Sequence, residues 1–86
     1  MSDNPFTFED LKRLLVDRVG MNPEDVTNEP DLTFDEMGLD SLAFVELQLA
    51  MENEYHFRIS DEDAHRIITV SDAIDFMNEQ LAERSH

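Results

Sequence analysis

Cysteine is absent from the sequence, which excludes disulfide bonds, thiolate metal sites and cysteine nucleophiles. Any thiol chemistry would therefore have to come from a cofactor. Glycine occurs only twice, so no glycine-rich loop can cradle a phosphate. No apolar run approaches the roughly 18 residues that a membrane span requires, and the N-terminus lacks the basic-then-apolar pattern of a signal peptide. These absences together predict a cytoplasmic protein.

Basic residues are also scarce. Lys and Arg total 6 against 21 Asp and Glu, which gives a formal net charge of −15. Such a surface repels nucleic acid phosphates and anionic membranes. It attracts basic patches on partner proteins and favours fast, salt-sensitive association. The acids are concentrated, because thirteen of them and one basic residue, Arg58, lie between Glu24 and Asp63. We therefore expect protein partners with basic patches, no nucleic acid and no membrane.

The length of the chain, 86 residues, indicates one small domain with a thin core. Apolar residues at helical spacing predict an all-α fold. We expect a small four-helix bundle of three longer helices and one short helix, with a long first loop. The domain would span residues 1–86, with a loose N-terminal tail over 1–6 and a polar C-terminal end over 83–86. We expect it to be a monomer.

Residues that typically start and stop helices set the expected boundaries. The first helix would begin at Thr7, with Asp10 forming an approximate capping box, and Gly20 would end it. A second approximate capping box, Thr69 with Asp72, would begin the last helix.

The connection over 21–39 is long for a small bundle. Pro23 to Val26 is expected to form one short helical turn, and Leu32 and Phe34 are spaced to anchor the loop on the core. Ser60 would cap the short third helix. That helix is expected to carry the apolar residues Ala64, Ile67 and Ile68.

The stretch over 38–42 is the point around which the chain is organised. Asp40 is a good helix N-cap, because its carboxylate can accept a hydrogen bond from a first-turn backbone N–H. Ser41 then occupies the first helical position, with its hydroxyl in solvent beside the positive end of the helix dipole. Gly38 lets the preceding chain turn tightly. The sequence thus predicts one displayed serine next to a carboxylate.

The helix expected from about Ser41 to about Tyr55 carries two apolar faces at 100° per residue. The broad face is suited to the core and comprises Ala43, Phe44, Leu47, Ala50, Met51 and Tyr55. The second face is a stripe of Leu42, Val45 and Leu49 flanked by acidic Glu46 and Glu52. Because a surface helix needs only one apolar face, this stripe is predicted to bind partners. The alternative is a helix buried on nearly all sides.

These residues resemble the signature of acyl carrier proteins. Gly-Leu-Asp-Ser-Leu at 38–42 is similar to the family's G-x-D-S-L, and Glu46-Leu47 continues the match. The segment over 59–64 also matches, and Ile-Thr-Val-Ser-Asp at 68–72 resembles the family's I-x-T-V-x-D. The resemblance covers nearly the whole chain at the family's usual spacing.

The resemblance implies that Ser41, flanked by Asp40 and Leu42, carries 4'-phosphopantetheine as a phosphodiester, with acyl groups bound to its thiol. It implies a carrier and not an enzyme. Its partners would be a phosphopantetheinyl transferase, an acyltransferase, a ketosynthase and tailoring enzymes. We also expect the core to open beside Ser41 and shelter an attached acyl chain.

The expected role is that of a discrete carrier, since the chain begins and ends close to the domain edges. Dissociated type II polyketide synthesis is preferred over housekeeping fatty-acid synthesis, because Met37, Phe44 and Ser60 depart from the fatty-acid pattern. The family usually has proline where Ser60 stands. Fatty-acid synthesis remains the alternative.

Two other classes of function stay open. One is an acidic interaction module that acts without a cofactor. The other is a small hydrolase using Ser41, although the serine is not in a G-x-S-x-G turn and no histidine is a clear base. His56 is expected in a linker and His65 exposed on the short helix. The acids of 61–63 lack the spaced ligands of a calcium loop, so no metal site is expected.

Overall fold

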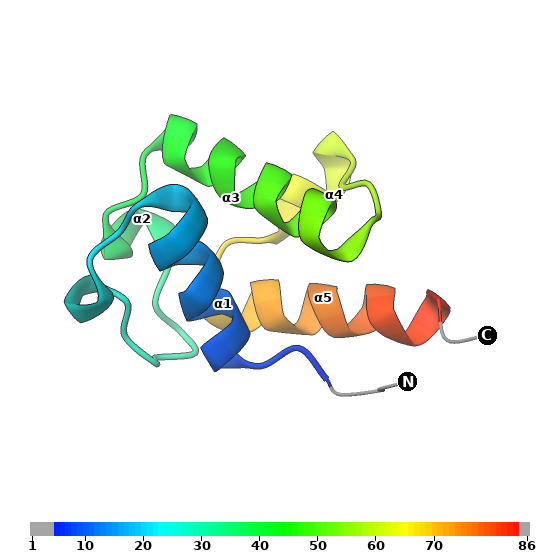
Figure 1. Ribbon diagram of the computed structural model, residues 1–86, viewed down its shortest axis with the longest axis horizontal. Coiled ribbons are helices and arrows are strands. Elements are labelled where there is room, and N and C mark those ends of the chain that lie inside the picture. Colours follow the sequence, from blue (N-terminus) through cyan, green and yellow to red (C-terminus); the bar gives the residue numbers. More distant parts are fainter. Residues whose placement is uncertain (1–4, 85–86) are drawn as a thin grey trace.

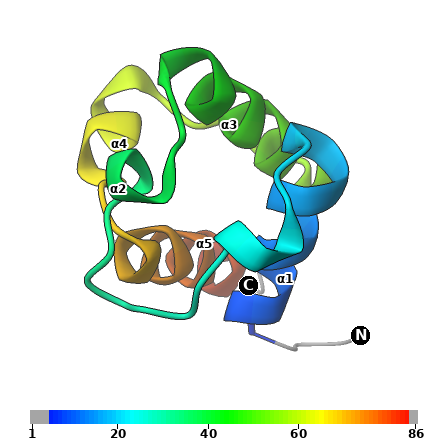
Figure 2. The same cartoon turned by 90° about the vertical axis from the view of Figure 1, so that its left-hand side faces the viewer.

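The computed structural model describes residues 5–84 and shows helices packed around one core (Figures 1 and 2). Three elements are long: α3, α5, and α1 continued by the π-helix η1. In chain order the elements are α1 (Phe8–Leu14), η1 (Leu15–Val19), the 3₁₀ turn η2 (Pro23–Asp25), α2 (Phe34–Met37), α3 (Ser41–Tyr55), α4 (Asp61–Arg66) and α5 (Val70–Arg84). Within the described residues β-pairing is limited to one isolated bridge, Thr33 with Thr69. The all-α prediction is confirmed.

The predicted helix starts are confirmed by their hydrogen bonds. Thr7 and Asp10 form a reciprocal capping box at α1. At α5 the Asp72 amide donates to Thr69 Oγ1 at 3.1 Å, and the Thr69 amide donates to the Asp72 carboxylate at 3.0 Å. Each pair satisfies backbone donors that a helix start would otherwise leave unbonded.

The first loop departs from the prediction, because it contains a helix of its own. Thr33 and Glu36 form a third capping box around α2: the Glu36 amide donates to Thr33 Oγ1 at 3.0 Å. One helical turn of four residues is too short to show a 3.6-residue period, so only the Thr-x-x-Glu spacing signalled it. The turn buries Phe34 and Met37 in the core.

Phe34 and Leu32 anchor the loop as predicted, and the backbone reinforces them. The Phe34 amide donates to the Ile68 carbonyl at 3.1 Å, and the Val70 amide donates to the Leu32 carbonyl at 3.0 Å. These bonds hold the chain before α2 against the chain between α4 and α5. The loop is therefore fixed at its end nearest α3.

The core brings together residues from every part of the bundle. Leu11, Leu47, Met51 and Met77 have 0% exposed area. The same cluster contains Phe34 and Ile67, and Ile74 packs against it partly buried. Phe76 is also buried within it.

The predicted loose tail over 1–6 is wrong at Phe6. This side chain is 2% exposed and packs edge-on against the Tyr55 ring, with the two ring centroids 5.6 Å apart. The Asn78 side chain accepts from the Phe6 amide at 2.7 Å and donates to its carbonyl at 3.1 Å. The chain therefore enters the fold beside α5 (Figure 1). Residues 1–4 lie outside the described part.

Two smaller boundary predictions also change. α4 ends at Arg66, so Ile67 and Ile68 follow it and do not continue its face. Ile67 is buried, whereas Ile68 is 56% exposed. At the other end, the predicted polar segment over 83–86 is helical through Arg84, since α5 extends to that residue.

The two faces of α3 can be separated by stability measurements. Leu47 has 0% exposed area and Leu49 has 51%. Leu47→Ala should lower the free energy of unfolding by about 2–5 kcal/mol because it leaves a core cavity. Leu49→Ala should change it by less than about 0.5 kcal/mol. Urea denaturation of both variants measures this, and equal losses would refute the assignment of the two faces.

Candidate functional site

The junction between α2 and α3 positions Ser41. Gly38 ends α2 in the left-handed conformation, with φ of 107°, which glycine adopts without steric cost. Leu39 is then 5% exposed, and its amide donates to the Phe34 carbonyl at 2.9 Å. With Leu39 held in the core, the next residues are directed to the surface.

Asp40 begins α3 as predicted. Its carboxylate Oδ1 accepts from the Ala43 amide at 2.8 Å, and its carbonyl accepts from the Phe44 amide at 2.9 Å. This fixes Ser41 as the first helical residue, and its side chain is exposed. No first-turn residue of α3 is acidic. The positive end of the helix dipole is therefore available to an anion attached at Ser41.

A groove of about 530 Å³ opens at Ser41 on the inward side of α3. Its apolar wall comes from α2, the junction before α3, α3, α4 and the segment after α4, through Phe34, Leu39, Phe44, Ala64, Ile67 and Ile68. The rings of Phe34 and Phe44 are 5.8 Å apart and tilted by 48°. Thr33, Asp35 and His65 add polar groups to the lining.

A second groove, of about 390 Å³, lies between α3 and α4. It is lined by Ser41, Phe44, Val45, Gln48, Asp61, Ala64 and His65. The two grooves share Ser41, Phe44, Ala64 and His65. Sequence reasoning placed His65 only as an exposed residue of the short helix. Its approach to Ser41 depends on how α4 packs, which no local pattern reveals.

The predicted partner stripe lies in solvent along α3. Leu42 is 69% exposed and Val45 is 45% exposed, and Glu46 is also exposed. Together with Leu49 these side chains form a continuous apolar and acidic strip, which we call the outward stripe: Leu42, Val45, Glu46 and Leu49. An exposed apolar run of this kind is a typical interaction surface.

Glu52 does not fit the outward stripe to which it was assigned. It is half-buried, and its carboxylate accepts from the Ile59 amide at 2.7 Å. Ile59 lies seven residues further along the chain, so the bond ties the segment after α3 back to the helix. A helical-wheel projection cannot show a hydrogen bond to a residue beyond the helix end.

The last turn of α3 is likewise committed to structure. Glu54 pairs with Arg18 at 2.7 Å and with Arg13 at 3.3 Å, which connects α3 to η1 and α1. Burial raises the pKa of Tyr55 above its ordinary value of 10.0, and the charge of Asp10 adds to the effect. The phenol is therefore neutral at physiological pH.

Comparison with known proteins decides between the remaining classes. Residues 9–77 match the family model described as phosphopantetheine attachment site. The chain belongs to this family of carrier proteins. It is therefore a carrier rather than a catalyst, and phosphopantetheine is its cofactor class. Acyl carrier proteins of this family partner with synthase enzymes.

Solved structures of acyl carrier proteins confirm the fold. The 3,7-dioxo-octyl form of the actinorhodin acyl carrier protein from Streptomyces coelicolor is 32% identical, with a TM-score of 0.77 over 96% of this chain and 99% of that chain. The 3,5-dioxohexyl form, a triketide mimic, is 34% identical, with a TM-score of 0.75 over 93% and 95%. The acetyl form is 32% identical, with a TM-score of 0.75 over 96% and 99%.

The described residues also bear on whether the carrier has a metal site or a membrane span. Among the residues that the structure describes, no group of three or more His, Cys, Asp or Glu is arranged to hold a metal ion. None of the described helices is long and apolar enough to cross a membrane.

Two substitutions can separate the contribution of the hydrogen bond from the Ala43 amide to Asp40 from that of the Asp40 charge. Asp40→Ala removes the cap and should lower the free energy of unfolding by about 0.5–2 kcal/mol. Asp40→Asn keeps an oxygen acceptor and should cost much less, since asparagine caps helices about as well. Urea denaturation of both variants provides the comparison. Equal losses would show that the charge, and not the hydrogen bond, stabilises the start of α3.

Proposed function

We propose that this carrier bears 4'-phosphopantetheine on Ser41 and delivers thioester-bound polyketide intermediates to the separate enzymes of a type II polyketide synthase. The observation that supports this most directly is the exposed Ser41 hydroxyl at the first position of α3, where two grooves meet. The carrier would act in the cytoplasm as a single monomeric domain.

The residues around Ser41 fit a phosphodiester-linked arm. The exposed hydroxyl can be reached by a modifying enzyme, and the helix N-terminus favours the negative charge that would follow. Asp40 holds this end of α3 in place, and Leu42 gives the enzyme an apolar contact next to the serine. The arm, when bound, supplies the thiol that the cysteine-free chain lacks.

The choice of polyketide over fatty-acid cargo rests on two observations. Three of the similar structures are of the actinorhodin acyl carrier protein, two of them with dioxo chains. The larger groove beside Ser41 combines an apolar wall with Thr33, Asp35 and His65. The Thr33 hydroxyl and the His65 imidazole can donate hydrogen bonds to ketone oxygens, which a purely hydrocarbon chain lacks.

The outward stripe is proposed to bind the partner enzymes: a phosphopantetheinyl transferase, an acyltransferase, a ketosynthase and tailoring enzymes. Its position next to Ser41 would place the arm at the entrance of each active site. Leu42, Val45 and Leu49 supply apolar contact. Glu46 supplies charge that complements a basic patch. Glu52 is left out of this set because its carboxylate is bound to the Ile59 amide.

The attachment site is tested by intact mass after incubation with coenzyme A, Mg²⁺ and a phosphopantetheinyl transferase. The unmodified sequence should gain the mass of one arm. Ser41→Ala should gain none and keep its helical circular dichroism. Ser71→Ala is the matched control and should load like the parent. Loading of Ser41→Ala on another serine would overturn the assignment.

The outward stripe is tested by transferase and ketosynthase kinetics across salt concentrations. Glu46→Lys should slow association and flatten its salt dependence, because it replaces attraction to a basic patch with repulsion. Val45→Asp should speed dissociation, because it places a charge in the desolvated contact.

Asp75→Lys on α5 is the control for the stripe, since it makes the same charge change at another exposed position. It should leave partner kinetics nearly unchanged. An equal effect of Asp75→Lys and Glu46→Lys would mean that only net charge matters and that α3 has no special role.

A further inference from the structure

His65, in the last turn of α4, lines both of the grooves that meet at Ser41. The two residues are 24 positions apart in the chain, and only the packing of α4 beside α3 brings them to the same hollows. His65 is exposed, so its imidazole is accessible to a group attached at Ser41.

The other ionisable groups in these linings are all acidic. α2 contributes Asp35, the start of α3 contributes Asp40, and α4 contributes Asp61. The segment after α4 contributes only Ile67 and Ile68. A phosphodiester at Ser41 would therefore meet three carboxylates, with His65 as the only Lys, Arg or His side chain among the lining residues.

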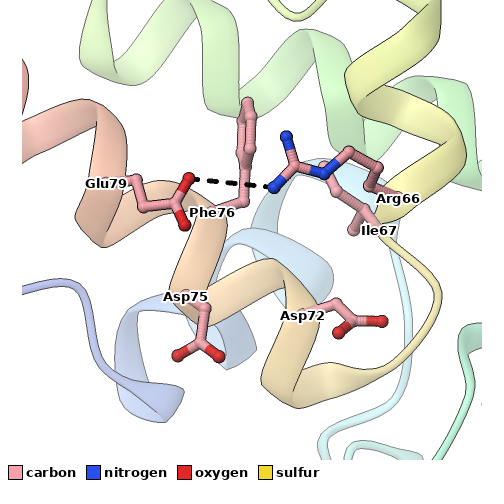
Figure 3. A pocket seen from close by; sticks show the side chains of 6 residues that line it. All are labelled: Arg66, Ile67, Asp72, Asp75, Phe76 and Glu79. Atoms are coloured by element: carbon pink, nitrogen blue, oxygen red, sulfur yellow. Dashed lines mark ion pairs between the residues drawn. The ribbon is translucent and has the colours of Figure 1, made fainter.

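The neighbouring cation, Arg66, lines a different hollow. It lies in a hollow of about 190 Å³ between α4 and α5, lined also by Ile67, Asp72, Asp75, Phe76 and Glu79 (Figure 3). There Arg66 pairs with Glu79 at 4.0 Å, and it also pairs with Asp63 at 3.5 Å. Figure 3 shows its guanidinium directed toward α5. Arg66 is thus engaged with acids away from the Ser41 grooves.

We propose that the His65 imidazole binds the phosphodiester of the arm on Ser41 and holds the arm between the two grooves. This rests on the proposed attachment at Ser41. The phosphodiester is the anion of the arm, and a protonated imidazole bonds an anion with a charge-assisted N–H donor. The contact would offset the repulsion from the three carboxylates, and the N-terminus of α3 would also favour the negative charge at Ser41.

The contact would depend on pH through histidine. Histidine is the side chain that commonly changes charge in the physiological pH range, so a pH-dependent step that is lost in His65→Gln would identify this imidazole as its source. Protonation of His65 would strengthen the contact, and deprotonation would loosen the arm. The phosphodiester itself does not change charge in this range, so it reports on its neighbour.

The test is a ³¹P NMR titration of the loaded carrier from pH 5 to 8.5. The phosphodiester resonance should shift with pH in one step over the histidine range. His65→Gln should abolish the step, because glutamine is polar but does not titrate. His65→Arg should give a pH-independent resonance near the low-pH position of the parent, because it keeps a cation throughout.

His56→Gln and His86→Gln are the matched controls and should retain the step. A flat titration of the loaded parent, or a step that persists in His65→Gln, would overturn the proposal. Intact mass of each sample separates this outcome from a failure of loading, which would instead refute attachment at Ser41.

Discussion

The hydrogen bond from the Ala43 amide to the Asp40 carboxylate is the interaction on which the site depends. It fixes where α3 begins, and that start decides which residues of the helix face the core. Because Leu39 is buried immediately before it, the chain passes from core to surface within two residues. Ser41 is displayed for this reason, and Phe44 is directed toward the grooves three residues later.

Several acidic residues of the carrier stabilise helix ends or hold helices together. Asp10, Glu36 and Asp72 complete capping boxes, and Glu52 and Glu54 hold the C-terminal end of α3 to the segment after it and to α1 and η1. Glu46, by contrast, is exposed in the outward stripe of α3. Net charge therefore describes the surface poorly, because many acids stabilise helix ends. Glu46, in the outward stripe, is the acid that we propose steers partners.

Local sequence signals predicted most of the helices. Capping residues at Thr7, Ser60 and Thr69 predicted three helix starts, and the helical period separated Leu47 from Leu49 correctly. What sequence reasoning missed depended on tertiary contacts: Phe6 is buried by Asn78 and Tyr55, and Glu52 bonds across the helix end. α2 was missed because four residues show no period. His65 reached the site only through the packing of α4, so nothing in its local sequence marked it.

We propose that α3 has one face buried in the core and one exposed face for partners, with Ser41 at its start. This proposal is tested most directly by NMR line broadening of the isotope-labelled, unmodified carrier on titration with a phosphopantetheinyl transferase. We expect broadening at Ser41 and along Leu42, Val45, Glu46 and Leu49, with little change on the exposed face of α5. Broadening centred on α5, with the α3 stripe unaffected, would contradict it.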